Sequence, residues 1–269
     1  MTPDAEMREK YIQVDGLTVR YLEGGEGRPL VLIHALGVQN SADQWARDFP
    51  ELLKIGRVIA WDTPGWGKSD FSPDGKYSFP FWLHYLRGFC DELELDQFDI
   101  MGQSLGAWIA ALFAYENPER IRRAVLLAMA GLNPQAPLTS DRFRLPTMEA
   151  LRSQYPTEES AQVAYESAHR PGRESVFKSI LDYINDPEVR GSEWGLATRL
   201  PDMNMPILFG NGDLNKAIPA EYTLQAFKLA PKGRVIILPS AGAPGGYNTP
   251  ELVRAGIDFF TAEIVEQAH

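Results

Sequence analysis

Residues 102–106 (GQSLG) hold a serine between two glycines in the pattern G-x-S-x-G. The pattern follows an apolar strand, residues 98–102 (FDIMG), and opens an apolar helix, residues 105–115 (LGAWIAALFAY). A nucleophilic serine on a strained turn requires this order of strand, sharp turn and helix. Side chains in place of the two glycines would collide with a neighbouring strand or helix, so we predict that Ser104 is a catalytic nucleophile.

The same turn predicts how the serine is assisted. The amide of Leu105 lies at the start of the helix, where the helix dipole and a free N–H can stabilise an oxyanion. A serine hydroxyl is a poor nucleophile without a general base, and an imidazole base is normally oriented by a carboxylate. The chemistry expected of this chain is attack of Ser104 on a carbonyl carbon.

Short β-branched runs alternate with longer amphipathic runs, which is typical of strands joined by crossover helices in a mostly parallel sheet. Asp15 and Gly16 form a hairpin-turn dipeptide between residues 10–14 and 18–23, so we expect the sheet to begin antiparallel. Buried strands are predicted at residues 29–34, 57–61, 98–102, 124–128, 206–209 and 234–239. Helices are predicted at residues 41–53, 79–93, 105–115, 220–229 and 250–264.

The alternation is interrupted between residues 133 and 199, where the chain has several arginines and prolines and no clear strand. A segment of that length between two core strands usually covers a site. We therefore predict an α/β core formed by residues 1–132 and 200–269, with residues 133–199 inserted as a helical cap, or lid.

The amino-acid composition limits the kinds of partner that this protein can be expected to bind. The 269 residues have a formal net charge of −10, which disfavours nucleic acid and anionic membrane surfaces, so a small-molecule substrate is expected. The single cysteine, Cys90, cannot form an intramolecular disulfide, and a charged N-terminus lacks the apolar core of a signal peptide, so we expect a cytoplasmic protein. We predict no cofactor and no metal. The sequence leaves open whether the chain is a monomer or a homodimer.

Beyond the elbow, four further segments share residue patterns and chain order with one family. They are LIHALG, WDTPGWGKSD, ILFGNGD and PSAGAPGGYNTPEL. On these segments the chain resembles the α/β-hydrolase family, and more narrowly its capped carboxylesterases and meta-cleavage-product C–C hydrolases. The resemblance runs from about Tyr11 to the C-terminal helix. It implies an eight-stranded, mostly parallel sheet with helices on both faces.

The resemblance also implies the remaining site residues. The catalytic acid maps to Asp213, just after the strand PILF. The second oxyanion amide maps to Leu36, in a loop where Ala35 replaces the commoner glycine. The loop after the strand RVIAW is full of turn formers, so we expect Asp62 to accept hydrogen bonds in a turn and not to act in catalysis.

The family's histidine base maps to Ala243. Gly242, Pro250 and Glu251 keep the register of the pattern that surrounds the base, so the histidine is replaced and not displaced. Of the other histidines, we expect His34 to shape the oxyanion loop, His84 to lie on a helix surface, His169 to belong to the cap and His269 to be a terminal residue. Two histories fit Ala243, an engineered replacement or a natural loss, and the intact Ser104 and Asp213 favour the first.

The implied function is that of a serine hydrolase acting on a carboxylic ester or similar carbonyl compound. Loss of the base should cost several powers of ten in rate, so we expect the chain as given to be nearly inactive. Two alternatives stay open: a C–C hydrolase of the meta-cleavage-product type, and a non-catalytic homologue that only binds a ligand. A hydroxynitrile lyase would need the same missing base, and nothing in the sequence selects a peroxidase.

Overall fold

The central sheet begins with the expected hairpin. Strands β1 (Arg8–Val14) and β2 (Leu17–Gly24) pair antiparallel, with Val14 opposite Leu17. The two turn residues, Asp15 and Gly16, both have positive φ angles, 44° and 83°. Such a turn matches the right-handed twist of paired strands, which is why Asp-Gly favours it.

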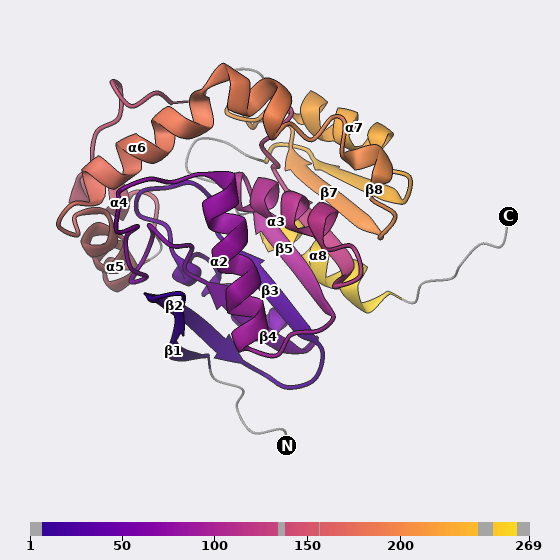
Figure 1. Cartoon of the computed structure of the whole chain (residues 1–269), viewed down its shortest axis with the longest axis horizontal. Coiled ribbons are helices and arrows are strands. Elements are labelled where there is room, and N and C mark those ends of the chain that lie inside the picture. The colour runs from indigo at the N-terminus through magenta and orange to yellow at the C-terminus, as the bar shows by residue number, and fades with distance from the viewer. Residues whose placement is uncertain (1–6, 134–137, 156, 242–249, 263–269) are drawn as a thin grey trace, which may run out of the picture.

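The computed structural model describes residues 7–133, 138–155, 157–241 and 250–262. Its eight strands form one sheet in the order β1-β2-β4-β3-β5-β6-β7-β8, and every pair from β4 onward is parallel (Figure 1). The remaining strands are β3 (Pro29–Ile33), β4 (Arg57–Trp61), β5 (Phe98–Gln103), β6 (Ile121–Leu127), β7 (Ile207–Gly212) and β8 (Gly233–Leu238). The predicted eight-stranded, mostly parallel sheet is confirmed.

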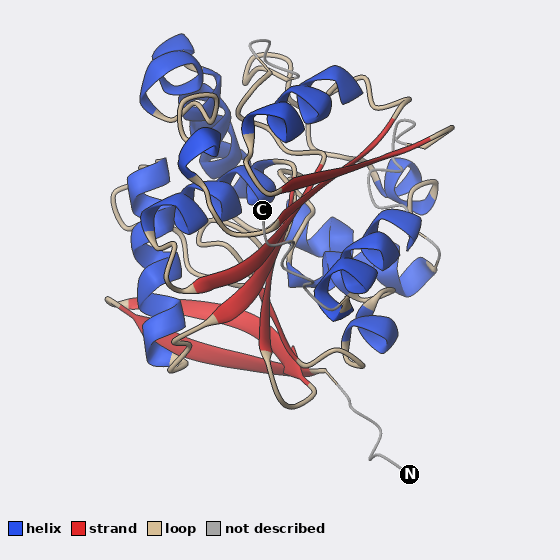
Figure 2. Cartoon of the chain, turned by 90° about the vertical axis from the view of Figure 1, so that its right-hand side faces the viewer, coloured by secondary structure: helices blue, strands red, loops and turns tan. Residues whose placement is uncertain are grey.

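Helices cover both faces of the twisted sheet (Figure 2). In β3, Val31 and Ile33 pack into one apolar cluster, while Leu30 and Leu32 pack into the other. One face is covered by α2 (Phe79–Glu92), α3 (Leu105–Glu116) and α7 (Ala220–Leu229), and the other by η1 (Ala42–Trp45), α1 (Phe49–Leu52) and α8 (Pro250–Thr261). Among the described residues, no helix is both long and apolar enough to cross a membrane.

The single helix predicted at residues 41–53 is wrong. The structure has a 3-10 turn, η1, followed by the four-residue helix α1. Pro50 explains the break, because it has no N–H to donate to the carbonyl four residues earlier and its ring clashes there. A proline is tolerated only in the first turn of a helix, and Pro50 lies in the first turn of α1.

The chain between β6 and β7 forms a group of helices beside the carboxyl ends of the strands (Figure 1). The group consists of α4 (Met148–Arg152), α5 (Glu158–Ala168), α6 (Arg173–Asn185), the π-helical turn η2 (Val189–Glu193) and the 3-10 turn η3 (Leu200–Asp202). Several hydrogen bonds join it to the core. In two of them, Trp108 Nε1 donates to the Trp194 carbonyl at 2.8 Å, and Phe79 N donates to the Tyr183 hydroxyl at 3.1 Å. We call residues 138–202 of this segment, without residue 156, the overlying helices.

Candidate active site

Ser104 stands on a strained turn at the carboxyl end of β5. Its φ and ψ are 55° and −116°, a conformation rare for any residue except glycine. Two hydrogen bonds to β6 and to the segment after it hold this conformation. Ser104 N donates to the Leu127 carbonyl at 2.9 Å, and Ala130 N donates to the Ser104 carbonyl at 3.2 Å. The serine is only half-buried and lies at the N-terminus of the twelve-residue helix α3.

The two glycines of the elbow are required by close backbone packing. A Cβ at Gly102 would lie 2.3 Å from the carbonyl oxygen of Gly106. A Cβ at Gly106 would lie 2.3 Å from the carbonyl oxygen of His34 and 2.5 Å from that of Ile33. The reason predicted for these glycines is confirmed. The packing also brings the first turn of α3, with Leu105, against the end of β3.

The loop that follows β3 contains Leu36, the predicted second oxyanion donor. Within the loop Gly37 N donates to the Ala35 carbonyl at 3.1 Å, which makes a tight turn around Leu36. Trp66 Nε1 donates to the Gly37 carbonyl at 3.0 Å. The structure thus brings the loop of Leu36 and the helix start of Leu105 together at one edge of the sheet.

Two glutamines link this loop to the elbow. Gln44 Oε1 accepts from Ala35 N at 2.9 Å, and Gln44 Nε2 donates to Gln103 Oε1 at 2.7 Å. Gln103 directly precedes Ser104, so the bridge fixes the spacing of the two segments. The Nε2 of Gln103 is buried and has no partner among the described residues. We did not predict this bridge, because its residues are 59 positions apart and only the sheet topology joins them.

His34 shapes the loop, as predicted. Its Nε2 accepts from Thr63 N at 3.2 Å, which leaves Nδ1 protonated and donating to the Ala35 carbonyl at 2.9 Å. Burial lowers the pKa of His34 to about 4, so the ring is neutral at neutral pH.

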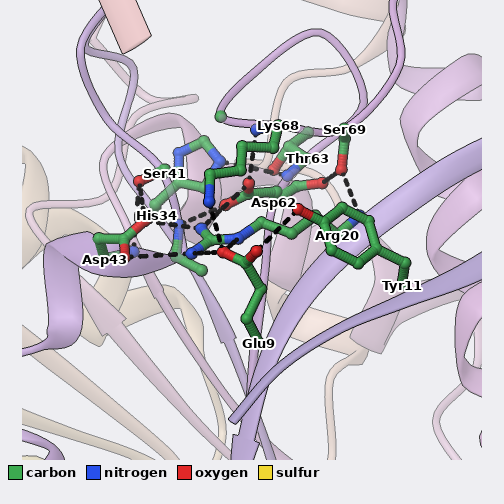
Figure 3. Close-up of polar contacts among 12 residues, drawn as sticks. Glu9, Tyr11, Arg20, His34, Ser41, Asp43, Asp62, Thr63, Lys68 and Ser69 are labelled. Atoms are coloured by element: carbon green, nitrogen blue, oxygen red, sulfur yellow. Dashed lines mark hydrogen bonds and ion pairs between the residues drawn. The ribbon is translucent and has the colours of Figure 1, made fainter. Parts of the chain in front are cut away.

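The adjacent loop after β4 is held by a buried carboxylate (Figure 3). Asp62 is fully buried and accepts from Ala42 N at 2.6 Å, Lys68 N at 2.9 Å and Arg20 Nη1 at 3.3 Å. Arg20 also pairs with Asp43 at 2.6 Å. Asp62 is therefore a turn acceptor, as predicted, and through Thr63 it supports His34.

Asp213 lies at the same edge of the sheet, just beyond β7. Its N–H donates to the Leu238 carbonyl of β8 at 3.1 Å, and the residue is exposed. The strand ends are tied in series, since Ala128 N, one residue beyond β6, donates to the Gly210 carbonyl of β7 at 2.7 Å. Because the carboxyl ends of parallel strands meet at one edge, Ser104 and Asp213 share the edge where sites of open α/β sheets occur.

The loop of Asp213 is held by an amide network. Asn215 Nδ2 donates to Asn211 Oδ1 at 3.0 Å, and Asn211 Nδ2 donates to the Ile218 carbonyl at 3.0 Å and to the Thr223 hydroxyl at 2.9 Å. Asn211 and Asn215 are both buried. These two asparagines were not predicted, although an Asn-rich turn after a strand is a recognisable signal.

Ala243, the predicted position of the missing histidine, lies outside the described residues, as does His269. The other histidines have partners elsewhere. His84 is on the surface of α2, as predicted, and its Nε2 lies 2.7 Å from Asp15 Oδ2. His169 follows α5, is exposed and stacks on Tyr165 with ring centroids 3.8 Å apart.

A hollow of about 390 Å³ opens beside the Leu36 loop. Its walls are formed by Leu36 to Gln39 on one side and by Phe143, Phe177 and neighbouring residues of the overlying helices on the other. The described residues that line it include Leu36 but neither Ser104 nor Asp213. Arg142 and Arg144 give this wall a positive charge.

Comparison with known proteins agrees with this architecture. The family model described as alpha/beta hydrolase fold matches residues 28–243. The chain belongs to the α/β-hydrolase family.

Several relatives are hydrolases of one kind. The chain is 32% identical over 178 residues to a 2-hydroxymuconate semialdehyde hydrolase of Pseudomonas sp. (strain CF600), a match that covers 62% of this chain and 63% of that relative, less than two thirds of its length. It is 27% identical over 259 residues to a 2-hydroxy-6-oxo-6-(2'-aminophenyl)hexa-2,4-dienoic acid hydrolase of Metapseudomonas resinovorans, covering 87% and 84%. A solved meta-cleavage product hydrolase of Pseudomonas fluorescens IP01 superposes with a TM-score of 0.81 at 26% identity, covering 93% and 97%.

Proposed function

We propose that this protein has the active-site framework of a C–C bond hydrolase of the meta-cleavage-product type, with Ser104 as nucleophile and Asp213 as acid. The observation behind the proposal is the agreement of several relatives, in sequence and in fold, on hydrolases of 2-hydroxy-6-oxo dienoates and their analogues. This favours the alternative that the sequence left open over the carboxylic ester first expected.

The chemistry follows from the positions of the groups. After the dienol substrate has shifted to its keto form, the Ser104 oxygen bonds to the substrate's far carbonyl carbon and loses its proton to a base. The carbonyl electrons move onto oxygen, where the Leu36 and Leu105 amides would hold the charge. Collapse breaks the adjacent C–C bond, and the leaving carbon chain takes the electron pair as a conjugated enolate. Water then hydrolyses the acyl-serine to a carboxylic acid.

Ala243 disables this route in the chain as given. Without an imidazole, Ser104 keeps its proton, and removal of one member of a triad removes most of the covalent pathway. An engineered replacement remains our interpretation. If the histidine was instead lost naturally, we expect a protein that binds the substrate without cleaving it.

An ester hydrolase is the second candidate, because a serine elbow flanked by two backbone amides serves any carbonyl substrate. The test compares the chain as given with the Ala243→His variant, called the histidine-restored protein below. Each is assayed with 2-hydroxy-6-oxo-6-phenylhexa-2,4-dienoate, followed by loss of its absorbance, and with p-nitrophenyl acetate.

The proposal expects the histidine-restored protein to cleave the dienoate with a kcat/KM at least about 100-fold above its value for the ester, and at least about 1,000-fold above that of the chain as given. The Ser104→Ala change in the same background should abolish the gain. Efficient turnover of the ester alone would favour the esterase, and no turnover of either would leave ligand binding.

A further inference from the structure

Arg173 is an unusual charged residue of the overlying helices. It is the first residue of α6 and only 1% exposed. None of the ion pairs among the described residues includes it, and burial lowers the pKa of its guanidinium. Burying a cation without a contacting carboxylate costs free energy, because the charge loses its water. The hydrogen bonds of the guanidinium to neutral groups must offset this cost.

The guanidinium bonds to the two loops that frame the candidate site. Arg173 Nε and Nη2 donate to the Val38 carbonyl at 3.1 and 2.9 Å, and Nη1 donates to the Gly65 carbonyl. Val38 follows β3 and lies two positions after Leu36, while Gly65 belongs to the loop after β4. One planar group therefore ties both loops together, as only a multidentate donor can.

Trp66 completes the contact. The Arg173 guanidinium lies over its ring, 5.6 Å from the centroid, and the ring's Nε1 donates to the Gly37 carbonyl. Phe177, one turn later on α6, meets the same ring edge-on, with centroids 6.5 Å apart. The carbonyls of Gly37 and Val38 are thus fixed by two side chains that also stack on each other.

The geometry points to Arg173 as a positioning residue that reaches from the overlying helices and sets the loop of Leu36 for oxyanion binding. The inference rests on the proposed function, because it assigns the orientation of the Leu36 amide to that function. If Arg173 has this role, the loop of Leu36 is correctly positioned only when the overlying helices are docked on the core. Without these donors, two buried carbonyls lose their partners and the turn around Leu36 is free to shift.

Arg170 is a matched control. It lies one turn earlier, in the connection between α5 and α6, and also crosses to the core. Its Nη1 donates to the carbonyls of Gly67 and Ser69 at 3.1 and 2.6 Å, and its guanidinium lies 4.3 Å from the Phe71 ring centroid. All three contacts are with the loop after β4, so loss of Arg170 weakens docking without touching the loop of Leu36.

The experiment uses the full-length histidine-restored protein and adds Arg173→Met, Arg173→Lys or Arg170→Met. Hydrogen exchange by mass spectrometry follows the peptide of residues 34–40, whose Gly37 and Asn40 amides are bonded within the loop. Steady-state kinetics with the better of the two substrates separates kcat from KM. Thermal unfolding verifies that each variant is folded, and Arg173→Lys serves if Arg173→Met does not fold.

We expect Arg173→Met to speed exchange in the peptide and to lower kcat about 10- to 100-fold with KM within about threefold, because the lost stabilisation belongs to the transition state. Arg173→Lys should have an exchange rate and a kcat between those of Arg173→Met and the histidine-restored parent, since an ammonium cannot span both carbonyls. Arg170→Met should leave the peptide unchanged and kcat within about threefold.

Equal effects of Arg173→Met and Arg170→Met would overturn the inference and reduce Arg173 to a docking contact. So would faster exchange with an unchanged kcat. Absence of turnover in the histidine-restored parent would instead remove the proposed function, and with it the role assigned to Arg173. The exchange measurement distinguishes that failure, because it reports the contact with the loop without requiring catalysis.

Discussion

Ser104 and Asp213 lie at the same edge of one sheet, but the structure holds them in different ways. The segments around Ser104 are fixed by long-range contacts: Gln44 to Gln103, Arg20 to Asp62, and Arg173 to Val38. In the loop of Asp213, backbone hydrogen bonds join Asp213 to Leu238 and Leu214 to Ala241, and the Asn133 side chain bonds to the Ala217 carbonyl, but the network of buried side chains is local. Its Asn211 and Asn215 bond to each other and to partners within twelve positions.

We attribute the difference to the roles proposed for the two residues. A serine on an elbow needs a strained backbone and two amides aimed at one point, and strain persists only where the surroundings fix it. A carboxylate that orients an imidazole needs only to point at the ring, and it requires no strained backbone. We therefore expect changes near Asp213 to affect catalysis more than folding, and changes around the loops after β3 and β4 to affect folding strongly.

The largest effect is expected from Asp213→Asn in the histidine-restored protein. The imidazole would lose the group that sets its tautomer, so kcat should fall about 1,000- to 10,000-fold with little change in thermal unfolding. Asp202→Asn, at an exposed aspartate of η3, is the control and should leave kcat unchanged. A loss below about tenfold for Asp213→Asn would show that the acid lies elsewhere.

Asp62→Ala tests the other region by denaturant unfolding. Removing the fully buried carboxylate leaves two buried backbone amides unsatisfied and takes away one of the carboxylates that pair with Arg20. This should lower the free energy of unfolding by about 3–5 kcal/mol. Asp43, whose side chain is 36% exposed, pairs with the same arginine, and Asp43→Ala should cost about 1 kcal/mol or less. Equal losses would mean that burial does not set the strength of this network.

His34 predicts a pH dependence in the same region. Because its pKa is about 4 in the folded chain, the folded state binds fewer protons than the unfolded state between pH 6.5 and pH 4. Its contribution to stability is complete above pH 6.5 and is lost as the pH falls to 4, amounting to about 3 kcal/mol. Unfolding curves of His34→Gln should lack this component, and parallel curves for both proteins would contradict the assignment.

The smallest effect is expected from Asn215→Ala. It removes bonds to Asn211 and to the amides of Ala217 and Ile218, and should lower the free energy of unfolding by about 1–2 kcal/mol. Asn204→Ala, at an exposed asparagine, should cost less than about 0.5 kcal/mol. A cost for Asn215→Ala as large as that of Asp62→Ala would erase the contrast between the two regions.

The sequence predicted the features that depend on local pattern. The hairpin at Asp15 and Gly16, the buried strands β3 to β7 and the glycines around Ser104 all follow from residues close together in the chain. The burial predicted for residues 234–239 is wrong, because β8 is an edge strand and its residues are partly buried or exposed. The helix predicted at residues 41–53 is wrong because apolar spacing alone does not make a helix continuous where Pro50 interrupts its hydrogen bonds.

The features that escaped prediction depend on the fold. Arg173 and Val38 are 135 positions apart, and only the path of the chain between β6 and β7 brings them together. The position of Asp213 relative to Ser104 likewise depends on the sheet order. The proposed loss of the histidine base at Ala243 rests on the sequence, because this position lies outside the described residues.

The central claim is that Ser104 is a nucleophile served by a base at position 243. Reaction with a fluorophosphonate, followed by peptide mass spectrometry, tests it most directly. The account predicts that the histidine-restored protein is labelled at Ser104 alone and at least about 100-fold faster than the chain as given, while Ser104→Ala in that background is not labelled. Equal labelling of both proteins, or an adduct on another residue, would contradict it.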